Sequence, residues 1–312
     1  MTVDRDYVLP PLRRGMDHDH YDWSPFDAGR PKLEWPGGAR VALCVVVSLG
    51  HMEWRRPEGT YQVPNIAGGY GQGPFPNVTA WSHREYGHRV GVFRVLDVLE
   101  RHGIRPTVAM DALTAEHYPF LVRHCLARGC EIIAHGVSAN RMITSLMPED
   151  EERAYIRQSI DAVTHATGAA PAGWMGPDYG ESARTPRLLA EAGIRYVCDW
   201  ANDEQPYRLN VPRGDLYSLP VTLPLDDVDA LWNRRIDVEQ YGRMIRESFD
   251  TLREEGAQNG RLLVVTLHPF LIGQPFRIGF LDAALAHIAG SKAVWAAAGS
   301  EIIGHYAATR RI

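Results

Sequence analysis

The sequence predicts an α/β fold in which a parallel sheet closes into a barrel. Apolar, β-branched runs alternate with amphipathic helical segments along most of the chain, a pattern typical of parallel α/β proteins. About seven or eight such units can be counted, close to the number from which a barrel is built. No glycine-rich dinucleotide fingerprint follows the first strand. These observations favour a barrel over an open, doubly wound sheet.

The first predicted strand covers residues 40–49, where a continuous apolar run without polar alternation indicates burial on both faces. Residues 55–87 form a long segment without periodicity, which we expect to be either a functional lid or rim, or a plain surface excursion. Residues 89–102 have apolar side chains at helical spacing, and Gly103 ends this helix. The next predicted elements are a strand at 107–110, a helix at 119–128 and a strand at 132–134.

The second half of the chain continues the alternation. Pro148 and the acidic residues after it predict the start of a long helix that runs to about residue 167. Further predicted strands lie at 172–175, 196–198, 217–221, 262–267 and 294–297, and further helices at 185–192, 238–255 and 278–289. No low-complexity linker divides this series. We therefore predict one barrel domain at 39–312, preceded by an irregular arm at 1–38.

Composition excludes several classes of function. Of the residues, 45% are hydrophobic and 23% are charged, as expected for a chain with an ordinary buried core. The net charge of -5 leaves no basic surface for nucleic acid or an anionic membrane. The amino terminus lacks the apolar core of a signal peptide, no run is long enough to span a bilayer, and the four cysteines show no zinc-site spacing. We expect a cytoplasmic protein with buried, reduced thiols.

Polar side chains follow several of the predicted strands, at the point where each strand ends. In a parallel barrel the carboxyl ends of all strands open into one mouth, so we expect these side chains to meet there. Gly136 would let the chain turn sharply behind one of them. The residues concerned are His51, Glu53, His135, Asn140, Asp199, Trp200, Asp203 and His268, together with the turn at residues 173–179.

Four of these residues are predicted to be catalytic. Glu53, alone or with His135, would activate a water molecule as general base. His268 would protonate a leaving nitrogen, and Asp199 would orient one of the two histidines. Each also has a structural alternative: Asp199 could cap a turn, and the two histidines and Glu53 could be satisfied by nearby loops.

These motifs, in this order, resemble the polysaccharide deacetylase superfamily (carbohydrate esterase family four), on the branch close to allantoinases and cyclic-imide hydrolases. The resemblance spans about residues 41–295. It is carried by Glu53-Trp54, by residues 131–136, by residues 173–177, by residues 198–200 with Asp203 and 206–207, and by 267–269 with 273–275. It implies a distorted barrel of seven or eight (β/α) units, a hydrolase acting on carbon–nitrogen bonds other than peptide bonds, and His268 as general acid.

The metal site that the resemblance implies is incomplete in this sequence. Sugar deacetylases of the family hold a metal with one Asp of an acidic pair and two His, whereas this chain has His51 and Glu53 at the first position and Ala139 and Asn140 where the second His would stand. Zinc prefers imidazole and thiolate ligands to an amide. We expect either no cofactor or a divalent metal such as zinc in a degenerate site made of Glu53, His135 and one of His51 or Asn140.

Three hypotheses remain open. The first is the ring-opening hydrolysis of a small cyclic amide, imide or ureide; the second is a zinc-dependent N-deacetylase of an acetylated sugar; the third is a catalytically inactive member of the fold that binds a ligand. We expect a small-molecule substrate and, from the aromatic arm and the resemblance, a homo-oligomer. The predicted substrate-binding residues are His51, Asn140, Trp174, Trp200, Asp203 and Gln274.

Overall fold

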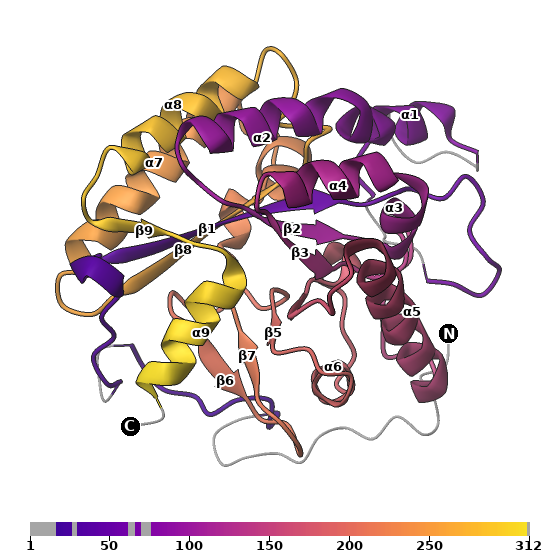
Figure 1. The fold of residues 1–312 in the computed structure, drawn as a ribbon, viewed down its shortest axis with the longest axis horizontal. Coiled ribbons are helices and arrows are strands. Elements are labelled where there is room, and N and C mark those ends of the chain that lie inside the picture. The colour runs from indigo at the N-terminus through magenta and orange to yellow at the C-terminus, as the bar shows by residue number, and fades with distance from the viewer. Residues whose placement is uncertain (1–16, 27–29, 62–65, 70–75, 311–312) are drawn as a thin grey trace.

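The computed structural model describes residues 17–26, 30–61, 66–69 and 76–310. Within them lies one nine-stranded sheet, curled into an incomplete barrel with helices outside it (Figure 1). The strands are β1 (Val41–Leu49), β2 (Thr107–Met110), β3 (Glu131–Ala134), β4 (Gly173–Trp174), β5 (Tyr196–Val197), β6 (Tyr207–Leu209), β7 (Leu216–Ser218), β8 (Arg261–Leu267) and β9 (Val294–Ala296).

The sheet runs in the order β6-β7-β5-β4-β3-β2-β1-β8, and β9 pairs with β1. Every pairing is parallel except that of β6 with β7. Between β8 and the β6 edge the ladder is interrupted, but Leu262 N–H donates to the Glu204 carbonyl (2.8 Å) and Val264 N–H to Thr222 Oγ1 (3.4 Å). The predicted distorted α/β barrel is therefore confirmed.

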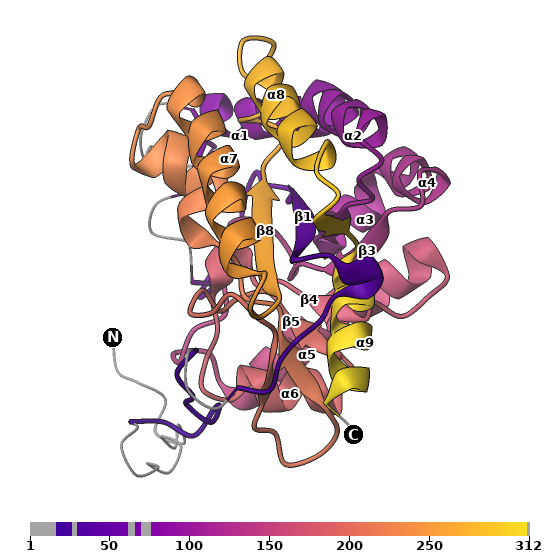
Figure 2. The ribbon, with the colours of Figure 1, turned by 90° about the vertical axis from the view of Figure 1, so that its left-hand side faces the viewer.

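The helices are α1 (Val78–Tyr86), α2 (Val92–Arg101), α3 (Ala112–His117), α4 (Pro119–Ala127), α5 (Glu149–Thr167), α6 (Thr185–Glu191), α7 (Val238–Glu255), α8 (Ile278–Ala289) and α9 (Gly299–Thr309). A π-helical turn at Gly87–Gly91 joins α1 to α2, and another covers Val228–Asn233. Helices α2, α7 and α8 cover the outer face of the β1–β8 region, as Figure 2 shows from the side.

Strand β1 shows how the core divides into two parts. All nine of its residues are buried. Its odd-numbered side chains, from Val41 to Leu49, pack with α2, α7 and α8 in one cluster, while Ala42, Cys44 and Val46 pack inside the barrel with Tyr196. Alternate residues of a strand point to opposite faces. Ser48 continues the even series, so it points into the barrel interior at the carboxyl end of β1.

Helix boundaries follow the predicted signals closely for the long helices. The Asp237 side chain caps α7 by accepting from Gln240 N–H, and Gly168 ends α5 in the left-handed conformation (φ 77°). Helices α1, α3 and α9 and the antiparallel strand β6 were not predicted. The segment at 55–87 is also not wholly irregular, because Asn77 accepts from Ala80 N–H and starts α1 within it.

Residues of the predicted arm pack on the body of their own chain. Leu33 and Trp35 are buried, Leu33 N–H donates to Asn259 Oδ1 (2.8 Å), and the Trp35 indole donates to the Arg261 carbonyl (2.7 Å). Packing against a neighbouring subunit, and with it the homo-oligomer, stays a prediction.

Two further expectations concern the burial of the cysteines and the presence of membrane-spanning segments. Cys44, Cys125, Cys130 and Cys198 are all buried and free. Among the described residues, none of the helices combines the length and apolar character that crossing a membrane requires. The predicted cytoplasmic location stays a prediction.

Candidate active site

The carboxyl ends of four strands bring the central side chains together. Ser48 lies at the end of β1, His135 directly follows β3, Met175 directly follows β4, and His268 directly follows β8. Strands β3, β2, β1 and β8 are consecutive neighbours, with Ser48 in register with Ala109 of β2. Gly136 (φ 68°) turns the chain after His135, and a Cβ there would lie 2.7 Å from the Pro177 ring. The parallel strands thus bring His135 and His268 to the same edge of the sheet, as predicted.

His135 is a buried, neutral imidazole whose two nitrogens are both engaged. Its Nδ1 lies 2.7 Å from the Met175 carbonyl oxygen, and its Nε2 lies 3.1 Å from Ser48 Oγ. A carbonyl can only accept, so Nδ1 carries the hydrogen and Nε2 accepts from the Ser48 hydroxyl. Burial lowers the pKa of His135 to about 4, and the nearby charges of His268 and Arg84 also lower it, against the opposing effect of the Met175 bond.

His268 has the opposite electrostatic environment. Its Nδ1 lies 2.7 Å from Asp227 Oδ1 and 3.8 Å from Asp226 Oδ1, and its backbone N–H donates to Asp227 (2.9 Å). Burial alone would lower the pKa of His268, but the two carboxylates outweigh burial and raise it. Burial also raises the pKa of Asp227. The two carboxylates therefore favour the protonated form of the His268 imidazole.

Arg84, from α1, contributes a partly buried positive charge. Its Nε donates to the Ala67 carbonyl (2.7 Å), and its guanidinium lies 4.8 Å from the centre of the Phe270 ring. Burial lowers its pKa to about 10, so it stays charged at neutral pH. It borders a cavity of about 10 Å³, which has room for about one water molecule. That cavity is lined by Ser48, Leu49, Gly50, Arg84, Gly87, His88, His268, Pro269 and Phe270.

Glu53 lies beside this cluster in a separate network. Its Oε2 accepts from Ser138 Oγ (2.7 Å) and pairs with Arg141 Nε (2.8 Å). Among the contacts of the described residues, none joins Glu53 to His135 or His268. The role of Glu53 as general base stays a prediction.

The predicted substrate contact of Asn140 needs correction. Asn140 is fully buried, its Oδ1 accepts from the backbone N–H of Glu53 (3.1 Å) and from Ser138 Oγ (3.1 Å), and its Nδ2 donates to the Glu53 carbonyl (3.3 Å). Both ends of the amide are therefore occupied in holding the loop that carries Glu53.

His51 also lies in a hydrogen-bonded cluster. Its Nδ1 is 3.1 Å from the Tyr118 hydroxyl, which in turn donates to Glu85, and its backbone N–H donates to Asp111 Oδ2 (2.7 Å). Burial and the neighbouring His117 lower its pKa to about 4. His51 is thus neutral at neutral pH and lies next to the start of α3, which Asp111 caps.

The predicted metal ligands do not converge in the part of the chain that the structure describes. The donor atoms of Glu53, His135 and His51 do not form a cluster, whereas one oxygen each of Asp226 and Asp227 and one nitrogen of His268 lie within 4.8 Å of one another. These potential ligand atoms already take part in hydrogen bonds. Nδ1 of His268 is bonded to Asp227, and Asp226 accepts from the Tyr179 hydroxyl and from Val228 N–H. A metal would have to displace these hydrogen bonds, so the cluster as arranged does not fit one.

Trp174 and Trp200 lie in different surroundings from those predicted. Trp174 is completely buried in the core around α5 and α6, so its assignment to substrate binding stays a prediction without support from its surroundings. Trp200 packs against His20 and Tyr21 of the arm, with ring centroids 5.6 and 5.7 Å apart. Gln274 is partly buried after β8, where its Nε2 donates to the Phe270 carbonyl (3.2 Å).

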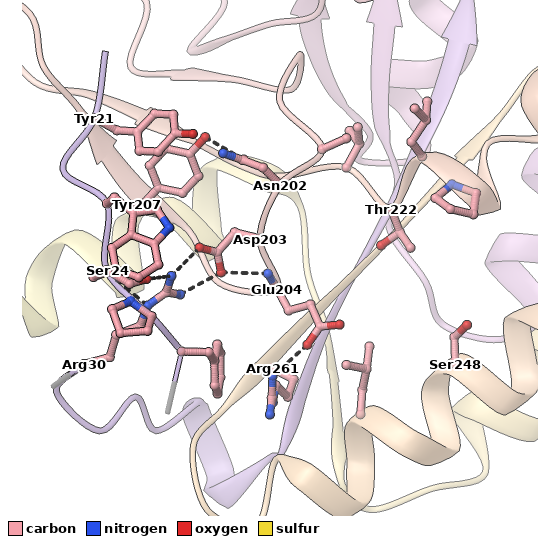
Figure 3. Close-up of a pocket in the computed structure, with 18 of the residues that line it drawn as sticks. Tyr21, Ser24, Arg30, Asn202, Asp203, Glu204, Tyr207, Thr222, Ser248 and Arg261 are labelled. Atoms are coloured by element: carbon pink, nitrogen blue, oxygen red, sulfur yellow. Dashed lines mark hydrogen bonds and ion pairs between the residues drawn. The ribbon is translucent and has the colours of Figure 1, made fainter. Parts of the chain in front are cut away.

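Asp203 lies at the opposite end of β8 from His268, which corrects its predicted role at the mouth. Figure 3 shows both of its oxygens bound by Arg30 at 2.7 Å, beside Glu204, which pairs with Arg261 at the start of β8 (2.7 Å). The seven residues of β8 span about 20 Å at the usual rise per residue. The ion pair of Asp203 with Arg30 thus attaches the arm to the body of the chain beside a groove of about 930 Å³.

The sequence interpretation missed Arg84, Asp226 and Asp227. Neither carboxylate follows a strand, yet an acidic pair inside the apolar stretch at 223–231 was a usable signal, because unpaired acids are poor choices for a core. Arg84 lies on α1, a helix without marked apolar periodicity, and no sequence signal distinguished it.

In fold and sequence the chain is similar to hydrolases of the polysaccharide deacetylase type. A polysaccharide deacetylase family model matches residues 82–197. A Schizosaccharomyces pombe protein assigned to the polysaccharide deacetylases is 26% identical over 308 residues, which covers 88% of this chain and 93% of the relative. A Helicobacter pylori peptidoglycan deacetylase is 22% identical over 231 residues, or 64% of this chain and 78% of the relative.

Two solved structures are similar over nearly their whole length. The crystal structure of Puue allantoinase has a TM-score of 0.83 and 29% identity, covering 92% of this chain and 97% of that one. A Pseudomonas aeruginosa PAO1 structure assigned to the polysaccharide deacetylases has a TM-score of 0.79 and 28% identity, with the same coverage. The predicted resemblance and the predicted enzyme class, a hydrolase of carbon–nitrogen bonds other than peptide bonds, are confirmed.

Proposed function

We propose that the protein opens a small cyclic amide, imide or ureide by adding water across a ring carbon–nitrogen bond. The observation that carries this proposal is a pair of imidazoles with opposite protonation states around one water-sized cavity: neutral His135, reached through Ser48, and His268, protonated beside Asp227. Titratable pairs whose pKa values are driven apart serve as base and acid. The likeness to the structure named as an allantoinase supports the cyclic substrate.

The geometry supports the following proton path. A water molecule in the cavity attacks the ring carbonyl carbon and gives a proton to Ser48 Oγ, while Ser48 passes its own proton to Nε2 of His135. The partly buried charge of Arg84 stabilises the developing oxyanion, and His268 gives its proton to the departing nitrogen. Addition of water therefore leaves a carboxylic acid, which loses its proton to solvent, and an amine or amide N–H. His135 then gives up the proton that it gained, and His268 regains the one that it lost, by exchange with solvent. Metal chemistry enters none of these steps.

The second candidate is the N-deacetylation of a sugar, favoured by the family match and the peptidoglycan deacetylase relative. A panel of hydantoin, succinimide, dihydrouracil, allantoin and N-acetylglucosamine oligomers, tested with zinc and with chelator, separates the two. We expect ring opening with a chelator-resistant rate. Acetate release that requires zinc would support the sugar deacetylase instead.

Variants test the assignment of residues. Ser48→Ala and His268→Ala should each lower kcat by about 100-fold or more, as expected for loss of proton transfer. His287→Ala, which removes an exposed histidine paired with Asp250, is the matched control and should leave turnover unchanged. Full activity in Ser48→Ala and His268→Ala would contradict the proton path.

A further inference from the structure

The peptide group between Met175 and Gly176 connects His135 to a buried carboxylate. Its carbonyl oxygen accepts from His135 Nδ1 at 2.7 Å, and its N–H donates to Asp199 Oδ1 at 2.7 Å. These two groups are opposite ends of one planar, conjugated unit. Asp199 was expected to orient a histidine directly, whereas the structure places a backbone peptide between them.

A second carboxyl group, that of Glu181, lies against Asp199. The two side chains are within hydrogen-bonding reach, and among the described residues Glu181 Oε1 and Asp199 Oδ2 are buried without any donor. Two ionised carboxylates repel each other in a buried site, and a single proton between them removes the repulsion and satisfies both oxygens. Burial, which is the main cause, raises the pKa of Asp199 to about 7 and holds that of Glu181 well above its usual range.

We propose that Glu181 and Asp199 share one proton and, carrying a single negative charge, position His135 through the Met175–Gly176 peptide. The charge strengthens the Gly176 hydrogen bond, which makes the Met175 carbonyl a better acceptor, because hydrogen bonds in a chain polarise one another. The stronger hydrogen bond from Nδ1 to the Met175 carbonyl keeps the hydrogen of His135 on Nδ1, so the Nε2 lone pair stays directed at Ser48. Glu181 is thereby a positioning residue, and the inference rests on His135 being the base of the proposed function.

Other titratable groups face this arrangement. Glu152 of α5, Tyr179 and Cys198 face the carboxyl pair, and Arg84 and His268 face His135.

Glu152 differs from the pair because its own oxygens are satisfied. They accept from Ser182 (2.8 Å), Thr185 (2.6 Å) and Arg184 (3.3 Å). Its negative charge disfavours a second charge on the carboxyl pair. Glu152 therefore provides a matched control, since it is a buried acid near the pair without a link to the peptide.

The direct test is the ring tautomer of His135 by nitrogen-15 NMR on protein with labelled histidine, the signal assigned with His135→Asn. We expect the Nδ1–H tautomer in the wild-type protein and in Glu181→Gln, whose amide donates to Asp199 and keeps it ionised. Asp199→Asn retains a carbonyl acceptor for Gly176 but loses the charge, and should shift the His135 signal. Glu152→Gln should not shift it.

Kinetics on whichever panel compound is turned over gives the second readout. Asp199→Asn should lower kcat on the order of tenfold, as for other outer-shell partners, with KM within about twofold. Glu152→Gln, the matched control, should retain kcat within about twofold.

A third readout, infrared spectroscopy, starts from the unaltered protein. Infrared spectra near neutral pH should show a protonated carboxyl band that Glu181→Gln abolishes. Absence of that band, an Nε2–H tautomer in the wild-type protein, or a His135 signal unmoved by Asp199→Asn would each overturn the proposal. If the signal moves but no panel compound is turned over, the peptide link stands and the proposed function fails.

Discussion

Replacing Asp227 by Asn should remove the proton from His268 at neutral pH. The Nδ1–Oδ1 contact of 2.7 Å is a hydrogen bond between an imidazolium and a carboxylate, and such charged hydrogen bonds are worth about 1.5–3 kcal/mol. Each 1.4 kcal/mol is about a factor of ten. The side chains of His268 and Asp227 are 14% and 0% exposed, so solvent screens this contact little. We therefore expect kcat/KM at neutral pH to fall by about 10- to 100-fold.

The sign of the pH dependence follows from the acid role of His268. In the wild-type protein the raised pKa of His268 keeps the active, protonated form present to higher pH. In Asp227→Asn that pKa falls, so the alkaline limb of the kcat/KM profile should move to lower pH. The assay is the pH–rate profile together with the NMR titration of the His268 ring.

A control and a refuting result complete the test. Asp250→Asn, which alters the exposed partner of His287, should leave both the profile and the His268 titration unchanged. If Asp227→Asn leaves the His268 titration as it is in the wild-type protein, the assignment of the acid is wrong.

Three further predictions concern the same edge of the barrel. Arg84→Met should lower kcat by about 100-fold, the usual cost of one oxyanion-stabilising group, with thermal melting as the check that the fold survives; unchanged kcat would remove Arg84 from the mechanism. Trp174→Ala should lower the free energy of unfolding by about 3–5 kcal/mol in denaturant titration, with KM unchanged in folded protein, and a raised KM would restore Trp174 to the substrate site. Dialysis against chelator should leave ring-opening activity intact, whereas a loss that zinc restores would show that the hydrogen bonds around Asp226 yield to a metal.

The long helices and the central strands could be predicted because their signals are local. Helix α7 has the same bounds as predicted, since Asp237 caps it and its apolar side chains recur at helical spacing. Helix α3 was missed because it is only six residues long, too short to show a period, although Asp111 caps it. Strand β6 was missed for a different reason: its three residues are mostly unburied and carry no apolar run.

The candidate site was predictable only where chemistry follows a strand directly. His135 and His268 follow β3 and β8, so a parallel sheet was sufficient to bring them together. Asp203 was misplaced because the chain after β5 contacts the start of β8, where Leu262 N–H donates to the Glu204 carbonyl, and no local pattern records this long-range contact. Asp227 reaches His268 across 41 positions of sequence, from a turn with no strand before it.

The arm and the base of the proposed reaction are attached to the same short stretch of chain. Both terminal nitrogens of Arg30 donate to Asp203. Asp203 lies four positions after Asp199, whose side chain accepts from the peptide group that binds His135. The groove beside Arg30 and the support of His135 are therefore separated by only three residues of chain, although they lie at opposite ends of the barrel.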